Sequence, residues 1–470
     1  MKKKRGQKKK SNRGHKKGSG ILSGIKPRTL HDYFACKTPH ESSAILNKSA
    51  VALPADSAVT IGTDRGPKIF NTVNKLFTLS KCCPVGAMVC GSAQLMSVPW
   101  ETLIKTYRAK LRDKSFAHLE DYASDFLRYL AGNRGLFPAA DQTQYFQRLV
   151  SAFYKWINSE VQTGVRKHIE KNGSISKSDI RKVTQSCIAK HFDQLRACKT
   201  LRGFTRQFEK RLLQKYSSVL RKLRAQHFQK LPLSPVDLAR IRSMSGWLFT
   251  KDNFRLQGTS GLVIAGFGEN DIYPRFSEFT VEGVIQNKLR FCQRRHTQVG
   301  VDCISTVVPF AQSEVVRGFV EGIDPGMERL LDKFLDEIFT NYPSVLLNNV
   351  KGLTQAAKTA AVKKTKVVGE QILKKFRKEF QEFRQETLVN PMISTVSVLP
   401  KDELAAMAEA LVNLTSFKRR FSPSAETVGG PIDVAVISKG DGFIWVKHKH
   451  YFKLELNPHF PTNYFREIFK

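Results

Sequence analysis

The stretch Val51-Ala52-Leu53-Pro54-Ala55-Asp56-Ser57, followed by Thr72-Val73-Asn74-Lys75-Leu76-Phe77, decides the fold that we predict for this chain. Both stretches have the apolar pattern of a buried strand, and each carries one charged residue, Asp56 or Lys75. An ammonium group among apolar side chains is costly unless a carboxylate pairs with it. We therefore expect Asp56 to pair with Lys75 and to join two buried strands.

A third stretch, Pro84-Val85-Gly86-Ala87-Met88-Val89-Cys90-Gly91-Ser92-Ala93, continues the strand pattern and ends in small residues. Small side chains let a substrate come close to backbone N–H groups. The order of the three stretches resembles the opening of proteasome β-subunits and bacterial proteasome-like peptidases, which are N-terminal-nucleophile (Ntn) hydrolases. The resemblance covers about 42–135, 261–325 and 399–447, and it implies an α/β fold, the four-layer αββα sandwich.

The resemblance also implies roles for individual residues. Asp56 resembles the acid that orients the active-site lysine, and Lys75 resembles that lysine. Gly91 resembles the glycine whose backbone N–H forms the oxyanion hole. Ser313 resembles the accessory serine, and Glu426 is the acid nearest to the closing motif, where Ala425 and Val428 replace the usual Asp and Ser.

The nucleophile is where the chain departs most from this family. The family uses an N-terminal Thr whose own α-amino group is the base, but here the first strand opens with Glu41-Ser42-Ser43-Ala44. Ser43 or Ser42 can make the same attack, with Thr38 as a more distant option. Each needs removal of about forty residues to free the α-amine. The resemblance thus implies proteolysis by an amide-bond hydrolase without a cofactor, in a homo-oligomeric ring.

A noncatalytic interpretation remains open, because a fold alone does not establish function. Asp56 would then cap a turn, Lys75 would be part of a structural ion pair, and the two serines would only begin a strand. Such a protein would be a proteasome-like scaffold that binds nucleic acid or an acidic protein.

Charge supports a polyanion partner. The 470-residue chain has 77 Lys and Arg against 41 Asp and Glu, a net charge of +36, and its first twenty residues contain ten basic residues and no acid. Such a run cannot bury apolar surface, so we predict a disordered leader over residues 1–41. The leader would either only keep the chain in solution or contact phosphates or acidic side chains through its first basic cluster: Lys2, Lys3, Lys4, Arg5, Lys8, Lys9 and Lys10.

The rest of the chain divides by its hydrophobic periodicity. We predict the first part of the sandwich at 42–135, an inserted basic helical module at 136–250, and the second part at 251–470 with a helical insertion at about 326–398. Helical spacing is continuous from 138 to 245, and strand patterns return at 261–268 and 276–283. These later strands imply a second sheet.

Several classes of protein are excluded or disfavoured. No run of about 18 apolar residues and no signal peptide is present, so we expect a cytoplasmic protein with no membrane partner. The eight cysteines include no C-x-x-C pair, which disfavours a zinc ribbon and a disulfide framework. His448 and His450 share a strand face, but we expect no carboxylate or cysteine near them, so we predict no metal site.

Overall fold

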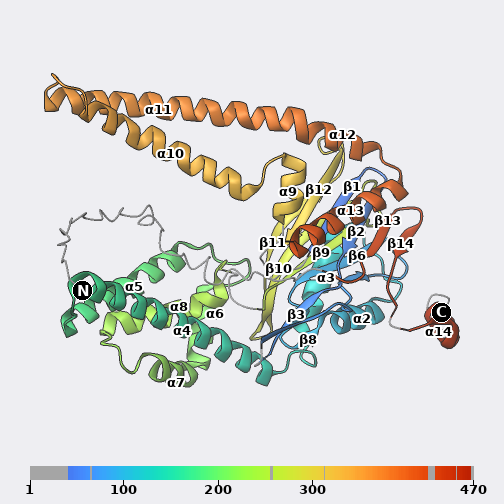
Figure 1. Ribbon diagram of the computed structural model, residues 1–470. Coiled ribbons are helices and arrows are strands. Elements are labelled where there is room, and N and C mark those ends of the chain that lie inside the picture. The colour runs from blue at the N-terminus through green and yellow to red at the C-terminus, as the bar shows by residue number, and fades with distance from the viewer. Residues whose placement is uncertain are drawn as a thin grey trace, which may run out of the picture.

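The computed structural model describes residues 41–63, 66–253, 258–311, 313–421, 429–450 and 452–466. It is a mixed α/β structure built on two five-stranded antiparallel sheets, with helices outside them (Figure 1). None of the helices in these ranges is long and apolar enough to cross a membrane.

The first sheet brings together strands that lie far apart in the sequence, from Glu41 to Lys447. Its strand order is β12-β1-β2-β13-β14. The hairpin of β1 and β2 is closed by Asn47, whose side-chain oxygen accepts hydrogen bonds from the Ser49 and Ala50 amides at 3.0 and 3.1 Å. The bounds are β1 Glu41–Asn47, β2 Ala50–Ala55, β12 Ser305–Ala311, β13 Asp433–Ser438 and β14 Gly442–Lys447.

The second sheet has the order β11-β10-β9-β6-β5. Its β10–β11 hairpin turns at Gln286 and Asn287, both with positive φ, as a tight two-residue turn requires. Two short hairpins, β3–β4 and β7–β8, complete the strands. The bounds are β3 Val59–Thr63, β4 Gly66–Phe70, β5 Leu76–Thr78, β6 Val85–Gly91, β7 Gln94–Leu95, β8 Val98–Pro99, β9 Ser260–Gly266, β10 Arg275–Ile285 and β11 Lys288–Gln298.

Three apolar clusters show how the sheets and helices pack. One lies between the two sheets and includes Leu53 of the first sheet and Met88 of the second. Another joins the outer face of the first sheet to α9 (Ser313–Glu321), α12 (Asn390–Val398) and α13 (Lys401–Arg420). The third joins the second sheet to α2 (Trp100–Leu111), α3 (Leu119–Gly132) and the helices that follow. Each sheet is therefore covered by the other sheet on its inner face and by helices on its outer face.

The helical prediction for 138–245 is confirmed. Aromatic stacking forms much of this core, since the ring of Phe146 lies 4.1 Å from Tyr216 and 4.9 Å from Phe249, centroid to centroid. The helices are α4 Ala139–Asn172, α5 Lys177–Ala197, α6 Arg206–Lys215, α7 Ser217–Phe228 and α8 Pro235–Thr250.

Two long helices, α10 (Pro325–Asn348) and α11 (Gln355–Arg384), form an antiparallel hairpin that projects from the first sheet (Figure 1). We call this hairpin the arm. A π-helical turn, η1 (Gln385–Val389), connects it to α12. The C-terminal part contains η2 (Leu454–Leu456) and α14 (His459–Arg466).

One expectation about the sheets needs correction. The strands predicted at 261–268 and 276–283 are present as β9 and β10, but they do not build a sheet separate from the first strands, because β9 pairs with β6. The strands of 42–96 are instead divided: β1 and β2 lie in the first sheet, β5 and β6 lie in the second, and β3 and β4 form a hairpin of their own. The strands β11 and β12 were not predicted, since β11 has a charged second half that hides the strand pattern.

Candidate functional site

The predicted ion pair between Asp56 and Lys75 is present in the structure. Asp56 directly follows β2 and Lys75 directly precedes β5, so the pair links the first sheet to the second. Lys75 Nζ lies 2.5 Å from Asp56 Oδ1, and the side chains are 6% and 0% exposed. Asp56 Oδ2 also accepts a hydrogen bond from the Ala58 amide at 3.1 Å, which fixes the carboxylate at the end of the strand.

Burial dominates the acid–base behaviour of Lys75. Loss of water lowers its pKa below the ordinary value, and this effect outweighs the stabilising charge of Asp56. The positive charge of Lys449 lowers the pKa of Lys75 further. A lysine with a lowered pKa next to a carboxylate is a common feature of catalytic sites, although structural ion pairs have it too.

A second buried pair, which the sequence reasoning missed, adjoins the first. Asp433 begins β13 opposite Ala55, the residue before Asp56. Its carboxylate lies 2.5 Å from Lys449 Nζ and 3.1 Å from His448 Nδ1. Burial acts to raise the pKa of Asp433, but these partners more than offset it, so the pKa is lowered. The expectation that His448 has no carboxylate nearby is therefore wrong.

Cys90 and Gly91 close the end of β6 beside Lys75. Lys75 is tied to this strand because its carbonyl accepts a hydrogen bond from the Val89 amide at 2.8 Å. Burial, together with the charge of Glu278, raises the pKa of the Cys90 thiol to about 12, so the thiol stays neutral. Gly91 has φ +82°, and a Cβ there would lie 2.8 Å from the Thr259 carbonyl oxygen. Only glycine fits this position without strain.

The two candidate serines, Ser42 and Ser43, occupy the start of β1. Ala44 belongs to the cluster between the sheets, whereas Ile45 packs toward the helices. Because side chains alternate along a strand, Ser43 shares the helix-facing side with Ile45. Its hydroxyl is buried and makes no hydrogen bond with any residue that the structure describes. The Ser42 backbone lies opposite Ala55, one residue from Asp56.

The pairing of β1 with β2 also has a local interruption. The register pairs Ser42 with Ala55 and then Ile45 with Ala52, and it skips the two positions opposite Pro54 and Leu53. Proline has no N–H to donate, so a central strand loses a ladder hydrogen bond there. The start of β1 is consequently held less firmly to β2 than the hairpin end is.

The remaining predicted site residues fall partly outside the description. Ser313 begins α9, two residues after Ala311, which pairs with Glu41 at the start of β1. Its side chain is not among those described. Glu426 and the basic cluster at residues 2–10 lie outside the described residues.

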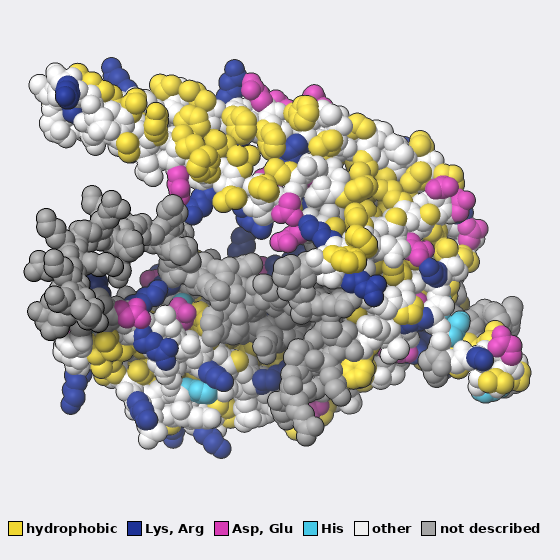
Figure 2. Space-filling view, viewed as in Figure 1, with side chains coloured by type: hydrophobic (Ala, Val, Ile, Leu, Met, Phe, Trp, Pro, Cys, Tyr) yellow, Lys and Arg dark blue, Asp and Glu magenta, His cyan; other side chains and the backbone are white. Residues whose placement is uncertain are grey.

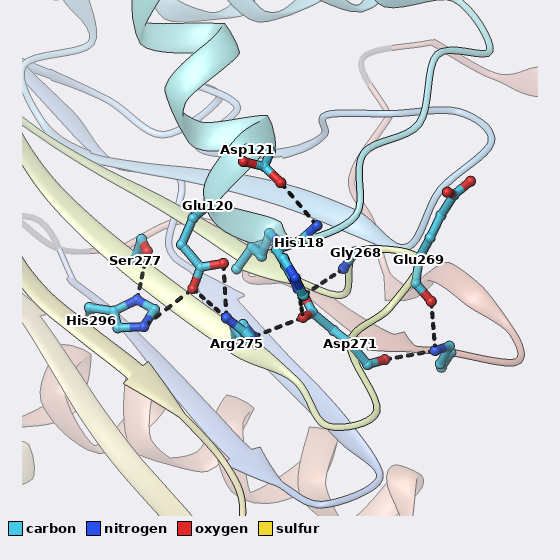
Figure 3. Close-up of polar contacts among 11 residues, drawn as sticks. His118, Glu120, Asp121, Gly268, Glu269, Asp271, Arg275, Ser277 and His296 are labelled. Carbon is cyan, nitrogen blue, oxygen red and sulfur yellow. Dashed lines mark hydrogen bonds and ion pairs between the residues drawn. The ribbon is translucent and has the colours of Figure 1, made fainter.

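A separate polar network lies on the outer face of the second sheet (Figure 3). Asp271 Oδ1 lies 2.7 Å from His118 Nδ1, and Asp271 Oδ2 accepts hydrogen bonds from the amides of Leu119 and Gly268, both at 2.9 Å. Burial acts to raise the pKa of Asp271, but these bonds and the charge of Arg275 outweigh it and lower the pKa. Asp271 thus ties the start of α3 to the β9–β10 turn.

The same network contains a serine–histidine–acid arrangement (Figure 3). Ser277 Oγ lies 3.1 Å from His296 Nδ1, and His296 Nε2 lies 3.2 Å from Glu120 Oε1. This order of groups occurs in hydrolases. However, Ser277 is 0% exposed, and Glu120 is already paired with the Arg275 guanidinium at 3.0 and 3.1 Å. The geometry therefore favours a structural role.

No group of three His, Cys, Asp or Glu side chains that could hold a metal occurs in the described part of the chain. In comparisons with known proteins, no family model and no curated protein matches this chain. Function must therefore be argued from the arrangement of its own residues.

Proposed function

We propose that this protein is an amide-bond hydrolase of the Ntn type, a proteasome-like peptidase. The observation that carries the proposal is the buried Lys75–Asp56 pair at the end of the space between the sheets, next to the start of β1. Two helix-covered sheets packed face to face are consistent with the four-layer αββα sandwich of that superfamily. A cytoplasmic location belongs to the same proposal.

In the proposed mechanism, cleavage before Ser42 frees an α-amine beside a hydroxyl. The amine takes the hydroxyl proton while the oxygen attacks the substrate carbonyl, and the Gly91 N–H donates to the oxyanion. The amine then gives the proton to the leaving nitrogen as the C–N bond breaks. Water hydrolyses the resulting ester and regenerates the hydroxyl. The lowered pKa of Lys75 suits a group that tunes the nucleophile.

The geometry favours Ser42 over Ser43 as the nucleophile. The Ser43 hydroxyl faces the helices, away from the space between the sheets where the Asp56–Lys75 pair joins them. The Ser42 backbone lies in register with the residue before Asp56. Ser43 is kept as the alternative nucleophile, because processing would change the start of the strand.

Intact mass and N-terminal sequencing of the purified full chain test the proposal. We expect cleavage before Ser42 in the wild type and none in the Lys75→Ala or Ser42→Ala variant. Lys401→Ala is the matched control, because Lys401 also pairs with an aspartate but is about half exposed and lies on the first turn of α13. An uncleaved wild-type chain that hydrolyses no peptide would refute the mechanism.

A second candidate function, a noncatalytic scaffold that binds nucleic acid or an acidic protein, is favoured by one cavity in the helical module. Residues 139–250 contain 22 Lys and Arg against seven Asp and Glu. Arg221, Arg224 and Arg242 line a cavity of about 290 Å³ whose wall includes no acidic residue. Guanidinium groups gathered in this way attract phosphate or carboxylate groups.

Salt titration of RNA and DNA binding tests this second candidate. Contacts to phosphates make the logarithm of the affinity fall linearly with the logarithm of the salt concentration. Replacing the three arginines with alanine should lower the affinity and make this salt dependence less steep. Lys333→Ala on the arm should change neither. Binding that is equal in all three proteins would exclude the cavity as the contact.

A further inference from the structure

The arm has an apolar surface that the described part of the chain leaves exposed. At 1.5 Å per residue, the 24 residues of α10 and the 30 residues of α11 extend about 36 and 45 Å. Figure 1 shows the two helices running side by side away from the sheets, and Figure 2 shows apolar side chains spread along the arm. Monomeric proteins seldom leave a continuous apolar surface of this length in water.

The side on which the two helices contact each other is already occupied. Arg377 of α11 pairs with Asp332 and Asp336 of α10 at 3.0 and 3.1 Å. Farther along the arm, Gly369 lets Phe339 pack closely against the α11 backbone, where a Cβ would lie 3.1 Å from that ring. The exposed apolar residues are therefore additional to those that hold the hairpin together.

On α10 the exposed residues form a stripe. Met327, Phe334, Tyr342 and Val345 are each between 57% and 61% exposed. Their separations of seven, eight and three residues place them on one side of the helix. Each residue advances about 100° around the helix axis. By this measure the stripe lies roughly 60–140° around the axis from Phe339, which faces α11.

A matching stripe follows α11. Its members, Val368, Ile372 and Phe383, are 52% to 59% exposed. Around the helix axis they lie roughly 80–140° from the buried Leu373, in the direction in which the α10 stripe is displaced from Phe339. Because the two helices are antiparallel, displacement in the same rotational direction places both stripes on the same side of the hairpin. The arm therefore presents one broad apolar face made by both helices.

The opposite net charges of α10 and α11 indicate what covers this face. Within its bounds, α10 has four Asp and Glu against two Lys and Arg, whereas α11 has nine Lys and Arg against three Asp and Glu. A second arm placed face to face, with its α10 against the first α11, brings opposite net charges together at both contacts. Every neighbouring pair of helices would then be antiparallel, as in a four-helix bundle.

We propose that the arm is a dimerisation element, which pairs with the arm of a second copy of this chain through the apolar face. The two-fold axis runs along the arm, so that the acidic helix of each copy lies against the basic helix of the other. This inference is independent of the proposed hydrolase activity, because the face lies on α10 and α11, away from the Lys75–Asp56 pair.

Sedimentation velocity of the full chain over a range of concentrations tests the proposal. We expect a dimer, and we expect Phe334→Asp/Ile372→Asp to raise the dissociation constant at least thirtyfold, the size of the loss at an interface hot spot, with an unchanged circular dichroism spectrum. The control Ile272→Asp, at a 75% exposed position between β9 and β10, should leave the dimer intact.

A zero-length carbodiimide cross-linker applied to mixed ¹⁴N/¹⁵N dimers tests the orientation, because it should join α10 carboxylates of one copy to α11 lysines of the other. A monomeric wild type, or a dimer that survives the double substitution, would overturn the proposal. A wild type that stays monomeric but sediments with anionic phospholipid vesicles would identify a membrane surface as the cover and would overturn it too.

Discussion

Loss of the Lys75 ammonium should destabilise the protein and abolish processing, and the two effects can be separated. Lys75→Met removes the partner at 2.5 Å from a carboxylate that is 0% exposed. Breaking a buried pair in this way typically costs about 3–5 kcal/mol. Domains are stable by only about 5–15 kcal/mol, so the variant would lose a large share of its stability.

The double variant Lys75→Met/Asp56→Asn removes both charges. The Asn side-chain oxygen can keep the hydrogen bond from the Ala58 amide. Its NH₂ group takes the place of Oδ1, so the hydrogen bond that Oδ1 accepted from Lys75 is lost, at a cost of about 1–3 kcal/mol. We therefore expect the double variant to be more stable than Lys75→Met by about 2 kcal/mol. Processing should stay absent in both variants, because the lysine is missing from both.

Urea denaturation at pH 7 gives the free energies of unfolding, and intact mass reports processing on the same samples. A loss of less than about 1 kcal/mol in the free energy of unfolding of Lys75→Met would contradict the burial of this pair, because removing the ammonium from a buried carboxylate is strongly destabilising. The catalytic role would be refuted if the folded double variant were processed like the wild type.

Three further predictions concern single residues. Arg290 is fully buried and paired with Glu282, and burial lowers its pKa to about 10, so Arg290→Met should cost about 3–5 kcal/mol in urea denaturation, with part of the loss recovered in Arg290→Met/Glu282→Leu. The pKa of Asp433 is lower in the folded protein than in the unfolded chain, where it is about 3.9. The stability that Asp433 provides is therefore fully present above about pH 3.9 and is lost as the pH falls through the pKa of the folded protein. Asp433→Asn should therefore cost about 1.5–3 kcal/mol at pH 7 and less at pH 3, and an equal cost at both pH values would contradict this. Gly91→Ala, which forces a Cβ to 2.8 Å from a carbonyl oxygen at φ +82°, should cost about 1–3 kcal/mol by thermal denaturation.

Sequence reasoning reached the Asp56–Lys75 pair because a charge within an apolar run needs a partner, and Asp56, the acid at the end of the other apolar run, was the correct one. The same argument applies to Asp433, which stands alone in the apolar run Pro431-Ile432-Asp433-Val434-Ala435. Its partner could not be identified, because Lys449 lies among several basic residues and becomes a neighbour only when β13 and β14 pair.

The face of each helix and strand was harder to predict than its existence. The periodicity around Ile372 predicts a helix, but the same apolar residues would serve as core or as exposed contact. Only the packing of α11 on α10 shows that Leu373 is buried while Ile372 is 52% exposed. Likewise, the sequence gives no reason to prefer Ser42 over Ser43, since the strand register decides which of them faces the helices.

The two buried ion pairs act on each other, and this bears on how the candidate site works. Lys449 lowers the pKa of Lys75 through its positive charge, and Asp433 partly cancels that charge at 2.5 Å. The carboxylate of Asp433 therefore weakens the repulsion between Lys449 and Lys75, although Asp433 is not the ion-pair partner of Lys75. Since Asp433 lies opposite the residue before Asp56, β2 and β13 fix the spacing between the pairs. The protonation of Lys75 therefore depends on the charge of Lys449 as well as on that of Asp56.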